Sequence, residues 1–352
     1  MLGLATELQR AGQPVLLAPL VPPDRPHPFL DSAAALGLPI ARLPGGDRRY
    51  LRQAAALTAV LRAHEATLVH AHVYVADVIS FLATRRSGVP LVATVHGRTG
   101  GDAKNRLYEW FDDKLLARRF DAVICVAPNG EARLAAAGCP RSRLHLVPNA
   151  LVPAPLLTRA EARTRLGLEP AELAIGWIGR LSAEKGADLL LAALREPGTP
   201  RVTAVVIGDG PERAALTHSA LDLPGGVQVR FAGAQADAAT LLPAFDAIAI
   251  SSRTEGLPMV LLEAMAAEVP VVAFAVGGIP TVLTQASGWV VPPERPDLLN
   301  AALAEALTQP AEARRRAALA RETLRDSFSG EAWAKRTLAV YEAARSRQVP
   351  SQ

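Results

Sequence analysis

Two carboxylates, Glu255 and Glu263, stand eight positions apart in the segment SSRTEGLPMVLLEAMAAEVPVVAFAVGG. Pro258 suits the first turn of a helix, where a missing N–H costs nothing, and Gly256 lets the backbone beside it approach a ligand closely. A helix that starts near Pro258 would aim its free N–H groups and its positive dipole end at the preceding loop, 251–257. Two acids beside such an anion site indicate a ligand that carries both hydroxyls and phosphates.

The same residues also fit an ordinary βαβ unit. In that interpretation Glu255 is a solvated loop residue and Glu263 faces water from the surface of the helix. The choice between the two interpretations depends on what the rest of the chain provides.

Two cations lie at another predicted strand-to-helix turn, in the sequence IGWIGRLSAEKGADLLLAAL. Arg180 and Lys185 are five positions apart and follow the predicted strand 173–178. A guanidinium offers a bidentate fork and an ammonium a point charge, so the two together suit a diphosphate. Alternatively, Arg180 pairs with a carboxylate of the protein and Lys185 is solvated.

The next predicted strand ends in IGDGPERAAL, where Gly208 and Gly210 bracket Asp209 and Pro211 starts a helix. This arrangement permits a close backbone approach by a planar group or a phosphate. An ordinary tight turn between a strand and a helix explains the pattern equally well.

A histidine, His96, ends a predicted strand in the first half of the chain. The carboxyl ends of parallel strands face the ligand crevice, where a histidine can donate a hydrogen bond to a substrate hydroxyl or share charge in a transition state. His70 and His72 alternate on another predicted strand, but they lack a third metal ligand nearby. The chain contains no Asp-x-Asp sequence, so a carboxylate-held Mg²⁺ or Mn²⁺ has no obvious site.

Composition bounds the class of protein. Half of the 352 residues are apolar and 20% are charged, which indicates a globular chain of two domains. No apolar run reaches about 18 residues, and the opening MLGLATELQRAGQ lacks a basic start and a cleavage site, so we predict neither a transmembrane helix nor a signal peptide. The two cysteines, Cys125 and Cys139, suggest neither a disulfide framework nor a zinc site, and favour a reducing cytoplasm.

Positive charge is concentrated in the first 150 residues. They hold 18 Lys and Arg against 12 Asp and Glu, a net charge of +6, whereas the remainder holds 20 against 22, a net charge of −2. The excess could serve an anionic acceptor or a membrane surface, or it could reflect a general preference for Arg. The segment 102–120 interleaves aromatic and basic side chains, and such a helix can lie on an anionic bilayer or pack on its own domain.

Short apolar runs alternate with helical runs along the chain, after an opening helix at Leu2–Ala11. The predicted strands are 15–20, 68–70, 91–96, 122–126, 144–147, 173–178, 202–207, 227–231, 247–250, 270–274 and 289–290. Such alternation predicts an α/β fold of two doubly wound, Rossmann-like domains with parallel sheets, facing each other across a cleft.

The predicted boundaries follow from composition. We assign 1–150 to an N-terminal Rossmann-like domain, 151–170 to a linker rich in Pro, Ala and Arg, 171–330 to a C-terminal Rossmann-like domain, and 331–352 to a final helix that can cross back to the first domain. A doubly wound domain normally opens with a strand and a Gly-rich turn, yet this chain opens with a helix. We therefore expect the first strand to be missing, either because the domain is built without it or because the chain is shortened.

Taken together, GRLSAEKG, GDGPE, SRTEGLPMVLLEAMAAEVPVVAFAVGGIP and GWVVPPERPDLLNAAL resemble the retaining glycosyltransferases of family 4, which have the GT-B architecture. The resemblance covers nearly the whole chain and is most specific in its second half. It implies transfer of a sugar from a UDP- or GDP-sugar with retention of anomeric configuration, and it implies neither a metal nor another cofactor.

The resemblance implies that the domain 1–150 lies on the acceptor side and that the domain 171–330 binds the nucleotide sugar. It also implies roles for individual residues. Arg180 and Lys185 would hold the diphosphate and stabilise the leaving group, and Glu263 would bind the ribose hydroxyls. Glu255 would hold the donor sugar, and His96 would lie near the transferred sugar. Backbone groups would complete the donor site, beside the sugar and its phosphate at Gly256, Leu257 and Pro258 and near the base at Gly208, Gly210 and Pro211.

The chain departs from the family pattern at three places. The Gly-rich loop after the first strand, which contacts acceptor and donor phosphate, is missing ahead of Met1. Thr281 stands where members usually carry a glutamate, and Ala150 replaces the usual glycine, with no aspartate after it. These departures bear on turnover more than on the fold or on donor binding.

The expected acceptor is a hydroxyl of a lipid-linked or polysaccharide intermediate, and we expect no nucleic-acid partner. The protein would be cytoplasmic, with peripheral contact at the inner face of the cell membrane through 102–120. Two other functions stay open: a nucleotide-sugar epimerase of the same architecture, and a catalytically silent sugar-nucleotide-binding or scaffold protein.

Overall fold

The computed structural model describes the chain apart from residues 23–25, 47–48, 86, 97–116, 153–154 and 348–352. It divides into two compact units. Apart from the residues just named, the first unit comprises Met1–Gly97, Gly101–Asn149 and Gly330–Gln352, and the second comprises Arg98–Gly100 and Ala150–Ser329.

The first unit contains a parallel sheet with the strand order β3-β4-β5-β6. Its strands are β3 (Val69–His72), β4 (Leu91–Val95), β5 (Ala122–Cys125) and β6 (Leu144–Leu146). A smaller parallel pair joins β1 (Leu20–Val21) to β2 (Leu43–Pro44). The predicted strand 15–20 is thus wrong in extent: before Leu20, pairing is limited to an isolated bridge between Leu17 and Ile40.

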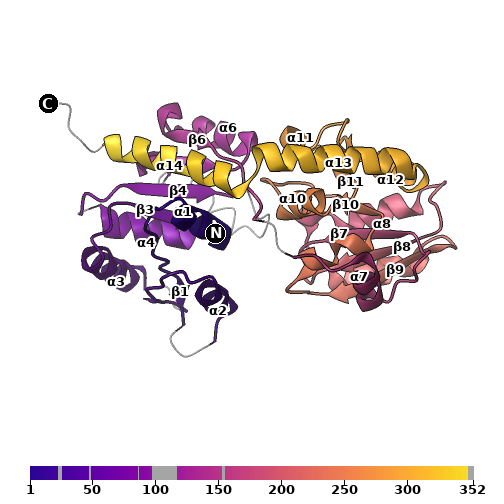
Figure 1. The fold of residues 1–352 in the computed structure, drawn as a ribbon, viewed down its shortest axis with the longest axis horizontal. Helices are drawn as coiled ribbons and strands as arrows, with labels where there is room; N and C mark the ends of the chain where they lie inside the picture. Colours follow the sequence, from indigo (N-terminus) through magenta and orange to yellow (C-terminus); the bar gives the residue numbers. More distant parts are fainter. Residues whose placement is uncertain (23–25, 47–48, 86, 97–116, 153–154, 348–352) are drawn as a thin grey trace. The chain divides into compact units, whose positions relative to one another are not determined.

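Helices cover both faces of this sheet. They are α1 (Leu2–Arg10), α2 (Pro28–Ala35), α3 (Tyr50–Ala63), α4 (Tyr74–Thr84), α6 (Pro128–Ala136) and α14 (Gly330–Ser346), with 3₁₀ helices at Ala117–Arg119 and Arg141–Arg143. Helix α14 begins only at Gly330, yet it lies along the sheet of the first unit beside α1 (Figure 1). Leu4 and Leu8 of α1 and Tyr341 of α14 share one buried cluster with Val92 and Ile124 of the sheet.

The second unit contains a six-stranded parallel sheet with the order β12-β11-β10-β7-β8-β9. Its strands are β7 (Ala174–Ile178), β8 (Val202–Ile207), β9 (Val227–Gly233), β10 (Ala247–Ile250), β11 (Val271–Phe274) and β12 (Trp289–Val291). All six residues of β8 are buried, as expected for a parallel strand with helices on both faces. Parallel pairing in every sheet confirms the predicted α/β class.

The helices of the second unit alternate with its strands. They are α7 (Arg159–Leu166), α8 (Ala187–Arg195), α9 (Arg213–Ser219), α10 (Met259–Ala266), α11 (Ile279–Val282), α12 (Pro296–Thr308) and α13 (Pro310–Ser327), with 3₁₀ helices at Ala183–Lys185, Ala220–Asp222 and Ala238–Ala244.

Helix α7 corrects the predicted linker, because it lies inside the interval 151–170. Thr158 and Glu161 form a reciprocal capping box at its start, and Gly167 ends it in the left-handed conformation. Ala162 and Leu168 are buried in the core of the second unit. The abundance of Arg and Ala in this interval thus reflects a capped helix, and not only a connecting segment.

The strand order of the second unit identifies where a ligand would bind. Strands β7 and β10 are neighbours in the sheet, but the chain first builds β8 and β9 on one side and then returns to build β10 on the other. In open α/β sheets, ligands bind beyond the carboxyl ends of the strands at such a reversal of strand order. The loops that follow Ile178 and Ile250 therefore frame the candidate site.

Candidate active site

Lys185 and Glu255 meet at the reversal of strand order in the second unit. The ammonium of Lys185 lies 2.6 Å from Oε1 of Glu255, and the hydroxyl of Ser252 donates to the same oxygen over 2.8 Å. Glu255 is only 7% exposed, whereas the Lys185 side chain is 31% exposed. The structure thus joins two residues that the sequence places 70 positions apart, with the carboxylate inside and the cation toward solvent.

The turn that carries Lys185 is fastened to the loop after β10. The hydroxyl of Ser251 donates to the carbonyl of Gly186 over 2.6 Å and accepts from the indole N–H of Trp177 over 3.1 Å. Gly186 has a φ of 65°, and a Cβ there would lie 2.0 Å from the Ser251 carbonyl oxygen. Glycine is therefore required at this position by both conformation and space.

Arg253 also holds the Lys185 turn in place, and the sequence did not predict this role. Its guanidinium donates to both carboxylate oxygens of Asp188, over 2.8 and 2.6 Å, and to the carbonyl of Ala183 over 2.7 Å. The hydrogen bonds from Arg253 lower the pKa of Asp188. The sequence signal for this pair is its position: Arg253 stands two residues before Glu255, and Asp188 stands three residues after Lys185.

Arg180 follows β7 and is exposed. Among the described residues, none accepts a hydrogen bond from its guanidinium or pairs with it, so the alternative of a carboxylate partner within the protein is not supported. An exposed, unpaired guanidinium at the carboxyl end of a central strand remains available to a ligand phosphate.

Packing within the protein explains why both residues, Gly208 and Gly210, are glycines. A Cβ on Gly208 would lie 1.8 Å from the Gly179 carbonyl oxygen, and a Cβ on Gly210 would lie 2.3 Å from that of Leu181. Close packing of this turn against the one that carries Arg180 therefore explains the glycines directly. A contact of this turn with a base stays a prediction.

Helix α10 begins at Met259, so Pro258 is its N-cap and not the first helical residue. Leu257 and Pro258 are buried, and the amide of Gly278 donates to the carbonyl of Gly256 over 2.6 Å. The loop before the helix is therefore firmly held.

Glu263 lies on α10 and is half-buried. Within the described chain, no residue donates a hydrogen bond to its carboxylate, and burial raises its pKa. A half-buried acid without an internal donor suits a ligand that brings hydroxyl donors of its own.

In the first unit, His96 follows directly after β4 and is exposed. Its Nε2 lies 3.0 Å from Nδ1 of His72, and the two rings stack with centroids 5.3 Å apart. His70 lies one layer further in, with its ring nitrogens 2.7 Å from the hydroxyls of Tyr341 and Thr94. Burial lowers the pKa of His70 to about 3, and desolvation by the surrounding protein lowers that of His96 to about 4.

No group of three or more His, Cys, Asp or Glu side chains in the described part of the chain could hold a metal ion. The histidine pair and the Lys185–Glu255 pair therefore offer hydrogen bonds and charge, and not a metal-binding set of side chains. The chemistry available at these sites is binding of hydroxyls and of anions.

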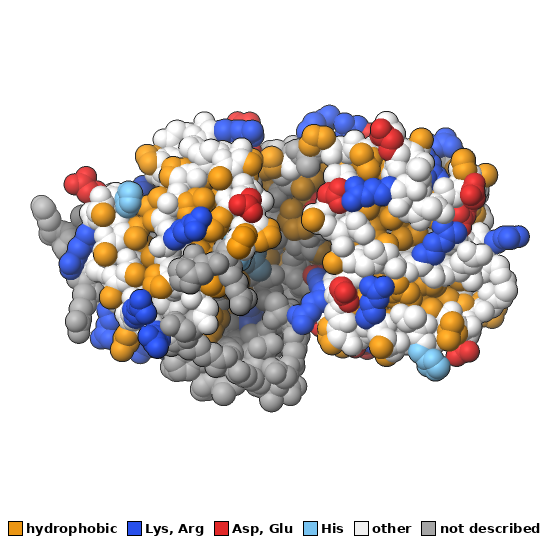
Figure 2. Space-filling view, turned by 90° about the horizontal axis from the view of Figure 1, so that it is seen from below, with side chains coloured by type: hydrophobic (Ala, Val, Ile, Leu, Met, Phe, Trp, Pro, Cys, Tyr) orange, Lys and Arg blue, Asp and Glu red, His pale blue; other side chains and the backbone are white. Residues whose placement is uncertain are grey.

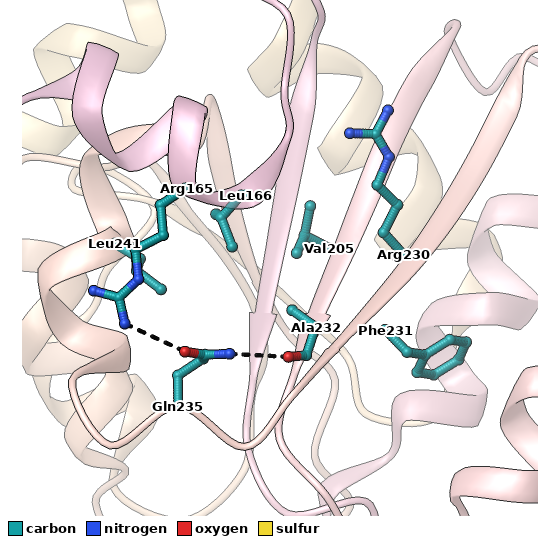
Figure 3. A pocket seen from close by; sticks show the side chains of 8 residues that line it. All are labelled: Arg165, Leu166, Val205, Arg230, Phe231, Ala232, Gln235 and Leu241. Carbon is teal, nitrogen blue, oxygen red and sulfur yellow. Dashed lines mark hydrogen bonds between the residues drawn. The ribbon is translucent and has the colours of Figure 1, made fainter.

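A larger cavity lies elsewhere in the second unit, away from the Lys185–Glu255 pair. It measures about 410 Å³, between α7, the 3₁₀ helix Ala238–Ala244 and the strands β8 and β9. Figure 3 shows Arg165, Gln235 and Arg230 around it. Both guanidinium groups already pair with acids, Arg165 with Asp237 and Arg230 with Glu172, and no predicted site residue lines this cavity. A much smaller cavity, of about 20 Å³, lies at the Lys185–Glu255 pair.

Two predictions concern charge and membranes. The segment 102–120 lies outside the described residues except for its last four, so its contact with a bilayer is not tested. Lys and Arg side chains are distributed over the face of the first unit that Figure 2 shows. No helix of the described chain is both long and apolar enough to cross a membrane.

Family models match the chain in two consecutive parts. Residues 1–154 match the model described as Glycosyltransferase Family 4, and residues 158–323 match the model described as Glycosyl transferases group 1. Together the two models extend over both units.

Curated relatives match most of the chain. The chain is 32% identical over 307 residues to a protein of Segniliparus rotundus named D-inositol 3-phosphate glycosyltransferase, covering 80% of this chain and 68% of the relative. A protein of the same name from Kineococcus radiotolerans is 30% identical over 315 residues, covering 79% of this chain and 71% of the relative.

Solved structures share the fold at lower identity. Anabaena HepE in complex with UDP and glucose superposes with a TM-score of 0.82 at 21% identity, covering 97% of this chain and 94% of HepE. Sucrose-phosphate synthase from Thermosynechococcus elongatus superposes with a TM-score of 0.76 at 21% identity, covering 98% of this chain and 92% of the synthase. This likeness over nearly the whole chain confirms the predicted GT-B fold.

Proposed function

The chain belongs to glycosyltransferase family 4, and from that premise we propose that it transfers a sugar from a UDP-sugar to a hydroxyl acceptor with retention of configuration and without a metal. The observation that carries this proposal is the Lys185–Glu255 pair at the reversal of strand order in the second unit. It presents a cation to solvent at the place where open α/β sheets bind phosphates, five positions after Arg180, which has no partner among the described residues.

The donor fits the described groups as follows. Arg180 and Lys185 neutralise the diphosphate and stabilise the charge that develops as it leaves. Glu263 accepts hydrogen bonds from the ribose hydroxyls, because its half-buried carboxylate has no donor among the described residues. Glu255, beside Ser252 and Lys185, accepts a hydrogen bond from a hydroxyl of the donor sugar. UDP is favoured over GDP because HepE, which shares the fold, was crystallised with UDP and with UDP-glucose.

Retention without a covalent intermediate requires attack from the face that the phosphate leaves. The bond between the anomeric carbon and the phosphate oxygen breaks, and the acceptor oxygen forms a bond to the same carbon. The acceptor's proton passes to the departing phosphate oxygen, so atoms and charge balance without a base from the protein. The protein's part is to hold the diphosphate and to stabilise its charge.

Two acceptor classes compete. The sequence predicts a lipid-linked or polysaccharide intermediate, whereas the names of the relatives point to an inositol phosphate. We favour a small phosphorylated polyol, because the relatives carrying that name cover four-fifths of this chain. The excess of cations in the first 150 residues suits an acceptor phosphate in either class.

The test is release of the nucleoside diphosphate, UDP or GDP, from a panel of UDP- and GDP-sugars, with inositol phosphate, a lipid-linked sugar or a glycan as acceptor. We expect release only with a UDP-sugar, faster with acceptor than without it, and unaffected by EDTA. Proton NMR of the product would report the anomeric configuration. Inversion, or a requirement for a divalent metal, would contradict the mechanism but leave the transferase assignment standing.

The same assay distinguishes the other two functions. An epimerase would convert the donor sugar without needing an acceptor, which product analysis would detect. A silent binding protein would be stabilised by UDP-sugars in thermal denaturation but would release no UDP under any condition.

A further inference from the structure

The histidines of the first unit form a repeating pattern that donor binding does not explain. Successive side chains on a strand alternate between faces, so His70 and His72 of β3 share one face. Thr94 and His96 share the same face of the neighbouring segment, because β3 and β4 are parallel and His72 is aligned with Thr94. Each histidine of β3 hydrogen-bonds the residue two positions beyond its aligned partner, His70 to Thr94 and His72 to His96.

The inner end of this pattern is fixed. His70 uses both ring nitrogens, toward Thr94 and toward the hydroxyl of Tyr341 on α14, at 2.7 Å each. Tyr341 is only 6% exposed. The His70 ring packs on the His72 ring with centroids 4.4 Å apart and planes 31° from parallel. His72 therefore stacks on a ring that cannot turn without breaking two hydrogen bonds.

The outer end of the pattern is constrained by the backbone. Val73, which follows His72, has a φ of 70° and a ψ of 149°, a conformation that a β-branched residue rarely adopts. Such strained residues persist only where their surroundings over-determine them, and they cluster at functional sites. Here the strained residue directly follows His72, the last residue of β3.

We propose that His72 is a positioning residue, which donates its Nδ1–H to Nε2 of His96 and thereby holds His96 as the tautomer that carries its proton on Nδ1. Each neutral imidazole carries one N–H, and only one of the two facing nitrogens can supply the proton of their hydrogen bond, so the donor's identity decides the tautomer of the other ring. With Nε2 occupied by His72, Nδ1 of His96 is its remaining polar atom. His96 then presents an N–H donor to a substrate hydroxyl. This role of His96 rests on the proposed function.

The structural part of the inference can be tested without activity. Long-range ¹H–¹⁵N spectra of ¹⁵N-labelled protein distinguish the two neutral tautomers of each histidine, and His96→Gln identifies the relevant signals. We expect a Nδ1–H tautomer for His96 in the wild type. His72→Asn places an amide nitrogen where Nδ1 was and keeps that tautomer, whereas His72→Asp places an acceptor there and converts His96 to the Nε2–H form. A wild-type His96 in the Nε2–H form, or a tautomer that ignores His72→Asp, would overturn the proposal.

The functional part requires a readout that a merely structural role would not move. We expect His72→Leu to lower kcat about 10- to 100-fold with the donor KM unchanged, because an unfixed His96 is displaced from its productive geometry. His72→Asn should keep most of the activity. His64→Asn, an exposed histidine at the end of α3, is the matched control and should match the wild type.

The outcomes separate this inference from the proposed function. A His72→Leu variant that unfolds at the wild-type temperature and keeps the wild-type kcat would overturn the positioning role. A wild-type protein that turns over no sugar nucleotide would overturn the proposed function, while the spectra would still decide the tautomer. If His72→Leu fails to fold, the Asn and Asp variants still answer the question.

Discussion

The Lys185–Glu255 centre of the second unit and the histidine pattern of the first are assembled by opposite means. The first is ionic and lies on loops, with a buried carboxylate held between an ammonium and a hydroxyl. The second is neutral at ordinary pH and lies along two paired strands, with pKa values of about 3 and about 4 for His70 and His96. One site offers charge, and the other offers directed hydrogen bonds.

This difference determines how each centre is kept in shape. Loops lack the regular backbone hydrogen bonds of paired strands. The Lys185 turn is therefore held by side-chain hydrogen bonds that involve Ser251, Trp177 and Arg253. The histidines need fewer, because strand pairing already sets the spacing of their side chains. Changes at the ionic centre should therefore have the larger effects.

The largest effect is expected from Lys185→Ala. Removal of a cation that stabilises a leaving diphosphate should lower kcat about 100- to 1,000-fold, measured as UDP release. The exposed Lys335→Ala on α14 is the control and should keep wild-type activity. Wild-type turnover by Lys185→Ala would remove Lys185 from the mechanism.

A double variant separates chemistry from stability. Lys185→Ala leaves the buried Glu255 without its cation, which should destabilise the protein, since a lone buried charge is costly. Adding Glu255→Gln removes that charge and should restore part of the unfolding temperature without restoring activity. Recovery of activity in the double variant would indicate that Lys185 serves the fold and not the reaction.

Gly186→Ala should give the next largest effect, chiefly on stability. The new Cβ would meet the Ser251 carbonyl oxygen at 2.0 Å, in addition to the strain of a φ of 65°. Gly198 is the matched control, because it has a φ of 88° but nothing within 4 Å of its Cβ position. We expect Gly198→Ala to cost about 1 kcal/mol from conformation alone, and Gly186→Ala to cost about 1–3 kcal/mol more from the clash.

Thermal denaturation of the two glycine variants measures the difference. Each kcal/mol corresponds to about 2–4 °C in a unit of this size, so the two variants should be clearly separated. Equal unfolding temperatures would mean that the Lys185 turn is free to move away from the loop after β10. In that case the hydrogen bonds from Ser251 and Arg253 would not control the position of Lys185.

The sequence predicted the two centres unequally well, for a physical reason. The donor-side residues lie in local motifs at the ends of strands. There, the residue type and its position in a βα turn are enough to predict which ligand groups it can bind. Lys185 and Glu255 were therefore predicted, although their ion pair was not, because a contact across 70 residues depends on which strands become neighbours.

Long-range contacts account for what was missed. Arg253 and Asp188 are 65 positions apart in the sequence, and only the fold brings the guanidinium to the carboxylate. The alternation of His70 and His72 was noted as a possible metal pair, and only the register of β3 with β4 connects them to Thr94 and His96. The capped helix α7 inside the predicted linker was readable locally, since Thr158 and Glu161 have the spacing of a capping box.

A smaller effect, of about tenfold, is expected from Arg253→Ala. The variant loses both the ion pair with Asp188 and the hydrogen bond to the Ala183 carbonyl, so the Lys185 turn loosens and the donor KM rises. Asp188→Ala removes only the ion pair and should change KM less, because the bond to Ala183 remains. Equal KM values for the two variants would show that the carboxylate, and not the turn contact, does the positioning.

The smallest effect expected is a dependence of stability on pH that belongs to the first unit. His70 has a folded-state pKa of about 3, against 6.5 when unfolded, so at intermediate pH the unfolded chain binds more protons. Its contribution to stability is fully present above about pH 6.5 and is lost as the pH falls toward 3. The pKa of His72 is lowered in the same direction. That of Glu263 is raised, so its contribution to stability is present below its unfolded pKa and is lost as the pH rises through the folded one.

Calorimetry at pH 7, 6 and 5 would follow this loss, and the variants identify its source. His70→Gln retains hydrogen-bonding atoms for Thr94 and Tyr341 but does not titrate, so the unfolding temperature should fall less steeply with pH than in the wild type. His64→Gln, in an exposed position of the same unit, should keep the wild-type slope. An unchanged slope in His70→Gln would mean that His70 binds its proton in the folded state. The histidine pattern would then not be neutral, because protonation removes the acceptor lone pair that one of the two hydroxyl partners of His70 can use.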